Sequence, residues 1–472
     1  MKKNRMKLFL ENFIFYGGVS MLQKALPFIT LPIITRLLVD PSAYGIADMF
    51  NLIISFGSAL AVLGIYDAIF REFFEEKDNK EYQKKVTSTG MNIVLISGLI
   101  IMILVLVFRT FIGKKVLGDE IYSNLVVLSG VGIYLSAISS IVSVPTRLRN
   151  QRKVYLIRGL TFPIIGFGVT IISIKLGYTY EALIYGTIGM SIISVISFYF
   201  INKNDFSLKI FDKKVAKELL KIGLPLVPTF LIYWIFNSMD RVMINRILGA
   251  SELGIYTVGS KVASISQLIY SAFAGGWSYF AFSTMKDEKQ VETNSKIFEY
   301  LGVISITVYI LAQPFISPVF NLFLKGDYIR GKEVFSFLFL SPLILMLYQT
   351  VGNQVIVIKK SYLTTLALLF GAVLNIILNL LFIESYGIRG AAFSTLNSYT
   401  VSVIMMYLIC YKYKLFIASK KILLISFFIL SGIYFDFFFN EYVYYKLIYG
   451  STLLIIIKIY LKDLKKLLNR GN

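Results

Sequence analysis

Apolar residues along this chain come in long runs separated by short polar segments. The runs are close to the roughly 20 residues that a helix needs to cross a ~30 Å hydrocarbon core. Windows of about 19 residues place fourteen membrane spans near 9–35, 45–70, 88–108, 122–146, 155–174, 182–201, 222–245, 254–281, 297–321, 334–358, 363–383, 390–411, 422–439 and 443–461. The pattern leaves no room for a sizeable soluble domain, and it predicts an all-α polytopic membrane protein.

The basic residues predict the orientation of these spans. If the N-terminus is cytoplasmic and residues within three positions of a span end are counted with the adjoining loop, 34 of the 48 Lys and Arg residues fall in cytoplasmic segments and 11 in outer loops. Lys24, Arg241 and Lys261 fall inside spans. An excess of Lys and Arg marks cytoplasmic loops, so we expect both termini in the cytoplasm of a bacterial plasma membrane. The first apolar run is too long for a signal peptide, and we expect it to remain as the first span.

The composition argues against several function classes. A net charge of +21 would indicate nucleic acid in a soluble protein, but here the charge sits in loops between apolar runs, so no nucleic-acid partner is expected. Histidine is absent and Cys410 is the one cysteine, so we expect no metal site, no disulfide framework and no catalytic residues. No Gly-rich phosphate-binding motif occurs, and no cofactor is expected.

The two halves of the chain resemble each other at a nearly constant offset. Arg36 matches Arg246 at an offset of 210, and Gly45 matches Gly254 at 209. A duplicated six-helix unit predicts two parallel lobes with a site between them, as in transporters with parallel repeats. The predicted domains are an N-terminal lobe, a basic cytoplasmic linker, a C-terminal lobe, and two extra spans with a basic tail, at 1–201, 202–221, 222–411 and 412–472.

Three stretches resemble a known family. They are Ser20 to Gly45, Ile222 to Tyr256 with its central Asp240-Arg241, and Asn375 to Ala392. They are similar to the Wzx-type oligosaccharide flippases of the multidrug/oligosaccharidyl-lipid/polysaccharide exporter superfamily. The resemblance implies two lobes around a cavity that opens alternately to each face, and a cargo of undecaprenyl-pyrophosphate-linked oligosaccharide for capsule, O-antigen or other exopolysaccharide. It also implies the phospholipid bilayer, a polysaccharide polymerase and glycosyltransferases as partners.

Ionisable residues inside spans are candidates for contact with cargo, because a charge at the bilayer centre costs at least ~2.5–3.5 kcal/mol. Lys24 is placed near the midplane, and we expect it to face a wet cavity. Asp240 and Arg241 lie at the same depth as Lys261 on the next span. Two interpretations remain open, a structural ion pair and direct contact with cargo. Asn237 is a polar candidate one turn before Asp240.

Prolines mark bends in the two helices that the resemblance identifies as gating elements. Pro27 and Pro32 lie in the first span, and Pro225 and Pro228 lie in the seventh. Proline bends helices for a sound physical reason, but its use as a gate comes from the resemblance.

Two alternatives to a flippase remain. A multidrug exporter of the same fold is one, although a cation exporter would more naturally carry acidic residues at mid-depth, where none is found. A membrane-embedded polymerase or transferase is the other, and the short outer loops and missing histidine argue against it.

Overall fold

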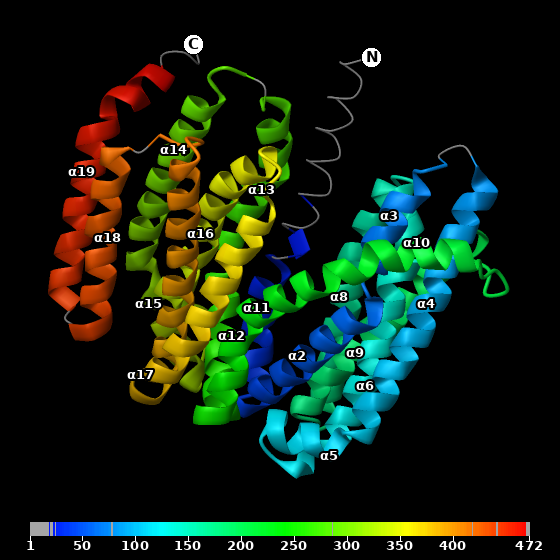
Figure 1. Ribbon diagram of the computed structural model, residues 1–472. Helices are drawn as coiled ribbons and strands as arrows, with labels where there is room; N and C mark the ends of the chain where they lie inside the picture. The colour runs from blue at the N-terminus through cyan, green and yellow to red at the C-terminus, as the bar shows by residue number, and fades with distance from the viewer. Residues whose placement is uncertain are drawn as a thin grey trace. The chain divides into compact units, whose positions relative to one another are not determined.

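The protein is described here from a computed structural model that covers residues 18, 22–23, 25–76, 79–285, 287–417, 419–439 and 442–468. Within these ranges the chain forms helices and no strands (Figure 1). Lys24 lies outside the described residues, and nothing structural follows for it. A shorter apolar helix runs over Ala25–Leu37, and further helices are α3 (Ile65–Phe73), α12 (Ala250–Ala263), α13 (Ser266–Ser283) and α19 (Tyr442–Leu468). α10 (Lys213–Gly223) is the first part of the longer helical segment Lys213–Leu248.

Ten helical segments in the described ranges are long and apolar enough to cross a membrane, so the protein is a multi-pass membrane protein. They are Ser42–Val62, Lys80–Val107, Glu120–Leu148, Arg152–Lys175, Tyr180–Asp205, Lys213–Leu248, Gln290–Phe323, Gly326–Val357, Tyr362–Lys412 and Lys420–Phe439. Each overlaps at least one predicted span. The count of fourteen and the two six-helix lobes remain predictions.

The longest of these segments is α17 (Tyr362–Lys412), which overlaps two predicted spans, 363–383 and 390–411. Gly387 interrupts its helical backbone with φ 60° and ψ −146°. That conformation is essentially restricted to glycine, so the break between the two predicted spans depends on this residue.

Contacts divide the described chain into two units. The first runs to Lys261 and adds 324–331 and 376–391, and the second comprises 262–323, 332–375 and the chain from 392 onward. The unit boundary therefore falls after Lys261, whereas the predicted lobe boundary at 202–221 stays a prediction.

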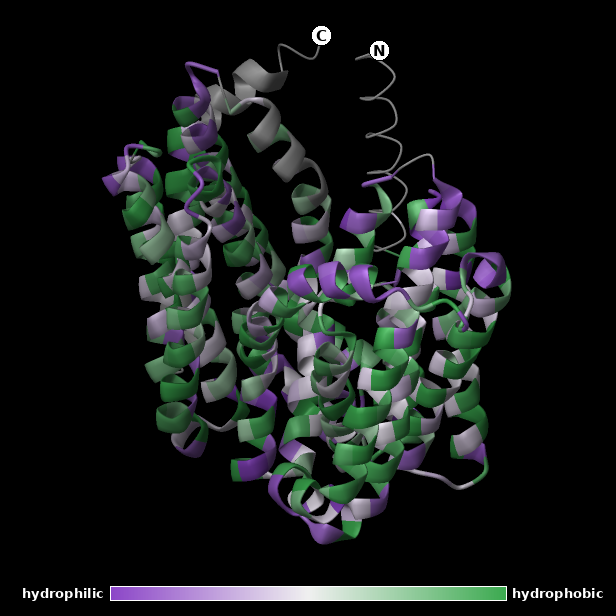
Figure 2. Cartoon of the chain, turned by 45° about the vertical axis from the view of Figure 1, so that its right-hand side comes forward, coloured by the Kyte–Doolittle hydropathy of each residue, from purple (hydrophilic) through white to green (hydrophobic). Residues whose placement is uncertain are grey.

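The first unit is built around α2 (Ser42–Val62), which packs against α4 (Lys80–Val107), α6 (Ser123–Val142) and α9 (Tyr180–Asn202). α8 (Arg152–Lys175) packs along α9, and α11 (Val227–Leu248) packs on α2. α11 and α2 run antiparallel. Trp234 Nε1 on α11 donates to Ser55 Oγ on α2 at 2.8 Å. Seven residues later on α11, Arg241 donates to Asp48, which lies seven residues earlier on α2. Hydrophobic residues cover most of these long helices (Figure 2).

α10 is the helical part of the predicted basic linker. It begins at an Asp212 cap, carries several lysines, and packs its apolar side on α3 and α4; Figure 2 shows it as a hydrophilic helix lying across the view. Gly64, at φ 68°, separates α2 from α3, and a Cβ on it would collide with the carbonyl of Gly223 at the end of α10. The predicted span 45–70 is broken at this point because the backbones meet here.

The second unit contains α13, α14 (Gln290–Ala312), α16 (Lys332–Val357), α18 (Lys420–Phe439), α19 and most of α17. Its core joins buried apolar residues of α14, α16 and α17, among them Phe298, Val351 and Met406. The thiol of Cys410 is buried there and donates to the Val351 carbonyl. Tyr309 and Tyr449 join α14 to α19 through their hydroxyls, 2.9 Å apart.

Candidate functional site

The helix starts of α2 and α12 cross at two glycines of the first unit. A Cβ on Gly45 would collide with the carbonyl oxygen of Ala250, and a Cβ on Gly254 would collide with the carbonyl oxygen of Pro41. Pro41 and Ala250 are 209 residues apart, as are Gly45 and Gly254. This reciprocal contact is what a two-fold axis between equivalent segments produces. The two segments that match at the repeat offset, around Gly45 and Gly254, therefore pack against each other.

A buried ionic network lies one turn further into these helices. Asp48 on α2 is 8% exposed, and its carboxylate accepts from Arg241 Nη1 at 3.3 Å and from Thr257 Oγ1 at 3.1 Å. Asp48 and Thr257 are again 209 residues apart. The network holds α11 and α12 against α2, and it explains why these two helices belong to the first unit.

Asp240 has partners of its own. It is 6% exposed, accepts a hydrogen bond from the Tyr256 hydroxyl, and accepts another from the backbone amide of Arg241 at 2.8 Å. The ion pair that the structure forms at this depth is therefore Arg241 with Asp48. Tyr256 is a side-chain partner of Asp240 in the described part of the chain, and the two interpretations left open for Asp240, a structural ion pair and contact with cargo, stay predictions.

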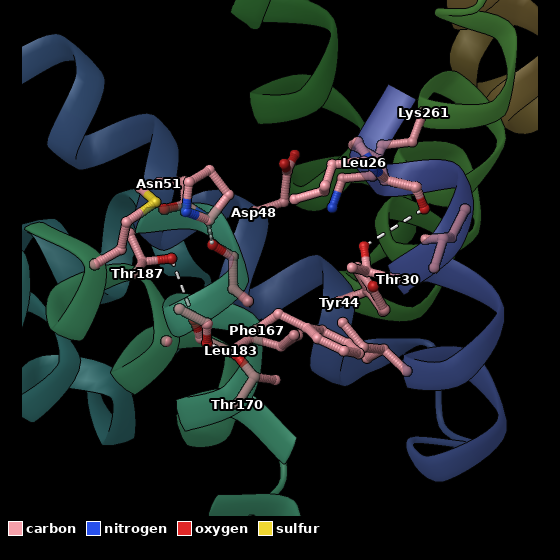
Figure 3. A pocket seen from close by; sticks show the side chains of 18 of the residues that line it. Leu26, Thr30, Tyr44, Asp48, Asn51, Phe167, Thr170, Leu183, Thr187 and Lys261 are labelled. Carbon is pink, nitrogen blue, oxygen red and sulfur yellow. Dashed lines mark hydrogen bonds between the residues drawn. The ribbon is translucent and has the colours of Figure 1, made fainter. Parts of the chain in front are cut away.

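Lys261 instead lies where α12 borders a pocket. Its Nζ is 4.6 Å from the centroid of the Tyr44 ring, a cation–π contact. Figure 3 shows it among the side chains around this pocket, together with Asp48 from α2. The predicted candidates Asp240 and Arg241 do not line the pocket, whereas Lys261 does.

The pocket has a volume of about 260 Å³ and is formed by the first helix, α2, α8, α9 and α12. Its lining alternates apolar residues with amides and hydroxyls, including Gln23, Asn51, Thr170 and Thr187. Because Asp48 is already engaged by Arg241 and Thr257, the lining is suited to an anionic or hydroxyl-bearing group near Lys261. We name it the outer pocket, because it lies beside the α2–α12 crossing, which the predicted orientation of the spans places at their outer end.

The remaining predicted residues are spread along the unit. Asn237 is exposed on α11, donates to the Tyr233 carbonyl at 2.7 Å, and does not line the outer pocket. Pro27 lines the pocket from the first helix, and Pro32 lies one turn later. Pro225 lies in a short 3-10 segment, and Pro228 lies in the first turn of α11, so this pair marks the junction between α10 and α11.

Sequence reasoning underestimated two residues. Asp48 was not among the predicted site residues, yet it is the buried centre of the network. Arg158 was not predicted as a site residue either, yet it lies six residues into α8 and lines a second pocket. The signal was available for Asp48, because the repeat offset of 209 pairs it with Thr257, directly after the stretch that ends at Tyr256.

Comparison with known proteins identifies the family. Residues 33–329 match the family described as polysaccharide biosynthesis protein. The chain belongs to this family. Two relatives are a probable low-salt glycan biosynthesis flippase of Haloferax volcanii, 24% identical over 85% of this chain and 82% of that protein, and a putative O-antigen transporter of Shigella flexneri, 22% identical over 75% and 86%.

Solved structures agree with this family in fold. A lipid II flippase, MurJ, in an inward-closed conformation matches with a TM-score of 0.69 and 21% identity over 96% of this chain and 99% of that one. An inward-facing transporter of the multidrug-resistance MATE family matches with a TM-score of 0.65 and 16% identity over 83% and 94%. The chain therefore shares the fold of these two transporters.

Proposed function

We propose that this member of the polysaccharide biosynthesis protein family flips lipid-linked oligosaccharides across the membrane. One observation carries the proposal: a polar pocket lies inside a membrane-spanning helix bundle, with Lys261 in its lining and its only lining carboxylate, among the described residues, already paired with Arg241. A sugar–diphosphate head group cannot cross hydrocarbon unaided. A pocket of this character offers it hydrogen bonds and a positive charge on the way.

The cargo that the family resemblance implies is an undecaprenyl-pyrophosphate-linked repeat unit, and we propose that it moves by alternating access. The α2–α12 crossing at Gly45 and Gly254 then serves as the closure at the outer end. Opening it requires the Asp48–Arg241 pair to separate. Pro27 and Pro32 in the first helix, and Pro225 and Pro228 before α11, are the proposed bending points.

We further propose that the protein is a transporter and not an enzyme, that it resides in the bacterial plasma membrane, and that both termini are cytoplasmic. Reporters fused after Lys85 and after Lys214 should then give cytoplasmic signals. An external signal at either position would overturn this orientation.

The decisive experiment reconstitutes the purified protein in liposomes that contain radiolabelled lipid-linked oligosaccharide. We expect the fraction of glycan reached by an added glycosidase to rise from about half to nearly all, because molecules of the inner leaflet become accessible. Lys261→Gln should slow this exchange, whereas the exposed loop variant Lys289→Gln should not. Exchange no faster than in protein-free liposomes would refute the flippase proposal.

A multidrug exporter is the second candidate, and the fold shared with the MATE transporter favours it. It predicts that deleting the gene sensitises cells to cationic dyes and leaves surface polysaccharide intact. The flippase proposal predicts the opposite on both measurements.

A further inference from the structure

A second pocket lies in the first unit, on the side of the bundle where α6 ends and α8 begins. Its volume is about 400 Å³, and α6, α8 and α9 line it together with Gln23. Gln23, Pro163 and Met190 line this pocket and the outer pocket alike. Gln23 is held in place by donating from Nε2 to the Gly159 carbonyl at 2.9 Å. We name this second space the serine pocket.

Six serines line the serine pocket, and helix geometry explains how they come together. Four of them are spaced three or four residues apart along α6 and its end, so they share one face of the helix. Two more are three residues apart on the facing side of α9. They are Ser136, Ser139, Ser140 and Ser143, and Ser191 and Ser194. So many hydroxyls on facing helices make this the most hydroxyl-rich of the pockets described here.

The hydroxyl protons of these serines are largely committed to the protein. Ser140 donates to the Ala137 carbonyl at 2.7 Å, Ser143 to the Ser140 carbonyl at 2.8 Å, and Ser191 to the Thr187 carbonyl at 3.0 Å. Ser139 and Ser194 share one hydrogen bond of 2.6 Å between α6 and α9. A hydroxyl that donates its proton keeps lone pairs that accept. The serine pocket therefore presents mainly acceptors, which suit a ligand rich in O–H or N–H donors.

The charge and the aromatic rings of the lining limit the chemical classes of ligand that the serine pocket could bind. Arg158 is the single charged residue among the described residues that line the pocket. It lies 5.8 Å from the Phe162 ring and forms no ion pair within the described part of the chain. Phe162 and Phe198 pack edge to face at 5.6 Å and add apolar surface. With no carboxylate in this lining, a cationic drug finds no counter-charge.

A diphosphate is also a poor match for most of this surface. Phosphate oxygens require N–H and O–H donors or cations around them. Among the described lining residues Arg158 is the one cationic donor, and four of the six serine protons are donated within the protein. A sugar ring carries several hydroxyl donors, an apolar face, and often a carbonyl or carboxylate substituent. The sugar hydroxyls can donate to the serine oxygens, the apolar face can pack on the aromatic rings, and the carbonyl or carboxylate can accept from Arg158.

We propose that the serine pocket is a sugar subsite, which binds a hexose-type unit of the cargo glycan through the serine oxygens and binds a carbonyl or carboxylate substituent of that sugar through Arg158. The inference rests on the proposed flippase function and refines it. The diphosphate is bound elsewhere along the path.

The test measures binding to the full-length protein in nanodiscs with two probes. One is the lipid-linked oligosaccharide purified from cells that lack this gene, and the other is undecaprenyl diphosphate without sugar. Losing the hydrogen bonds that these side chains would make to the sugar predicts about tenfold weaker binding of the glycan probe by the double variant Ser139→Ala, Ser194→Ala and by Arg158→Gln. Binding of undecaprenyl diphosphate should not change.

Ser129→Ala is the matched control, because Ser129 lies on α6, bonds its own helix at Leu125, and does not line the pocket. Thermal unfolding in the same nanodiscs, with Arg158→Lys as a charge-preserving variant, separates loss of binding from loss of fold. Unchanged glycan binding in the variants would overturn the subsite alone, and equal weakening of both probes would assign the pocket to the diphosphate instead. A wild-type protein that binds neither probe would overturn the proposed function and the subsite with it.

Discussion

Asp48 and Thr257 are hydrogen-bonded to each other, with 3.1 Å between Oδ2 and Oγ1, although 209 residues separate them in the sequence. That separation is the offset of the internal repeat. Residues that contact their own repeat equivalent lie next to a two-fold axis. Two segments that the repeat pairs in the sequence therefore contact each other here, beside the Gly45–Gly254 crossing.

The first prediction concerns the buried ion pair between Asp48 and Arg241. Removing either partner leaves an uncompensated charge in a buried position, so Asp48→Asn and Arg241→Gln should each lower stability by about 3 kcal/mol. The double variant should lose clearly less than the sum, by at least about 1 kcal/mol, because the two residues act as a pair. Thermal unfolding in one detergent checks this, and strictly additive losses would contradict it.

The second prediction concerns the helix crossing. Gly45→Ala and Gly254→Ala each place a methyl group against a backbone carbonyl, which cannot move aside as a flexible side chain can. Each should cost about 1–3 kcal/mol by overpacking and lower the yield of folded protein. Gly168→Ala in α8 is the control, since a Cβ there meets nothing within 4 Å. Equal yields and melting temperatures for the three variants would show that the crossing tolerates a methyl group.

The third prediction concerns Lys24, which the sequence places near the midplane and which lies outside the described residues. Lys24→Ala should keep insertion and protein level but abolish polysaccharide export, and Lys24→Arg should retain part of it, because a cation facing a wet cavity serves an anionic cargo. Complementation of a flippase-null strain, with membrane protein and surface polysaccharide measured together, provides the test. Full export by Lys24→Ala would remove it from the transport path, and loss of the protein would make it structural.

The fourth prediction concerns the start of α10. Hydrogen bonds from the backbone amides of Val215 and Lys214 hold the pKa of Asp212 below its usual value. A lowered pKa in the folded state means that the carboxylate adds stability above its unfolded pKa of about 3.9 and that this contribution disappears as the pH falls through the folded value.

Asp212→Ala should therefore lower the melting temperature at neutral pH, and the difference from the wild type should shrink below pH 4. Asparagine also caps helices, so Asp212→Asn should retain most of the cap without this pH dependence. A melting-temperature difference for Asp212→Ala that stays constant with pH would show that the charge of Asp212 contributes nothing to the cap.

The sequence by itself determined the class of this protein, because membrane spans need only local information. An apolar run of about 20 residues must be helical in a bilayer, where no water satisfies the backbone, and each of the ten spanning segments overlaps a predicted span. The repeat offset and the family resemblance were equally visible along the chain. So was the break between spans 363–383 and 390–411, since only Gly387 supplies its backbone conformation.

Only the tertiary structure decided which charges meet and which face a pocket. Depth in the membrane matched Asp240 with Lys261. In the structure, the antiparallel packing of α2 and α11 pairs Arg241 with Asp48, and Asp240 accepts a hydrogen bond from the Tyr256 hydroxyl. Likewise, Arg158 and six serines come from three helices, and no single helix shows that their faces meet. Helix rotation and crossing are set by side-chain packing between segments far apart in the sequence. A span predicted from hydropathy therefore indicates how deep each residue lies in the membrane, but not which residues of other helices it contacts.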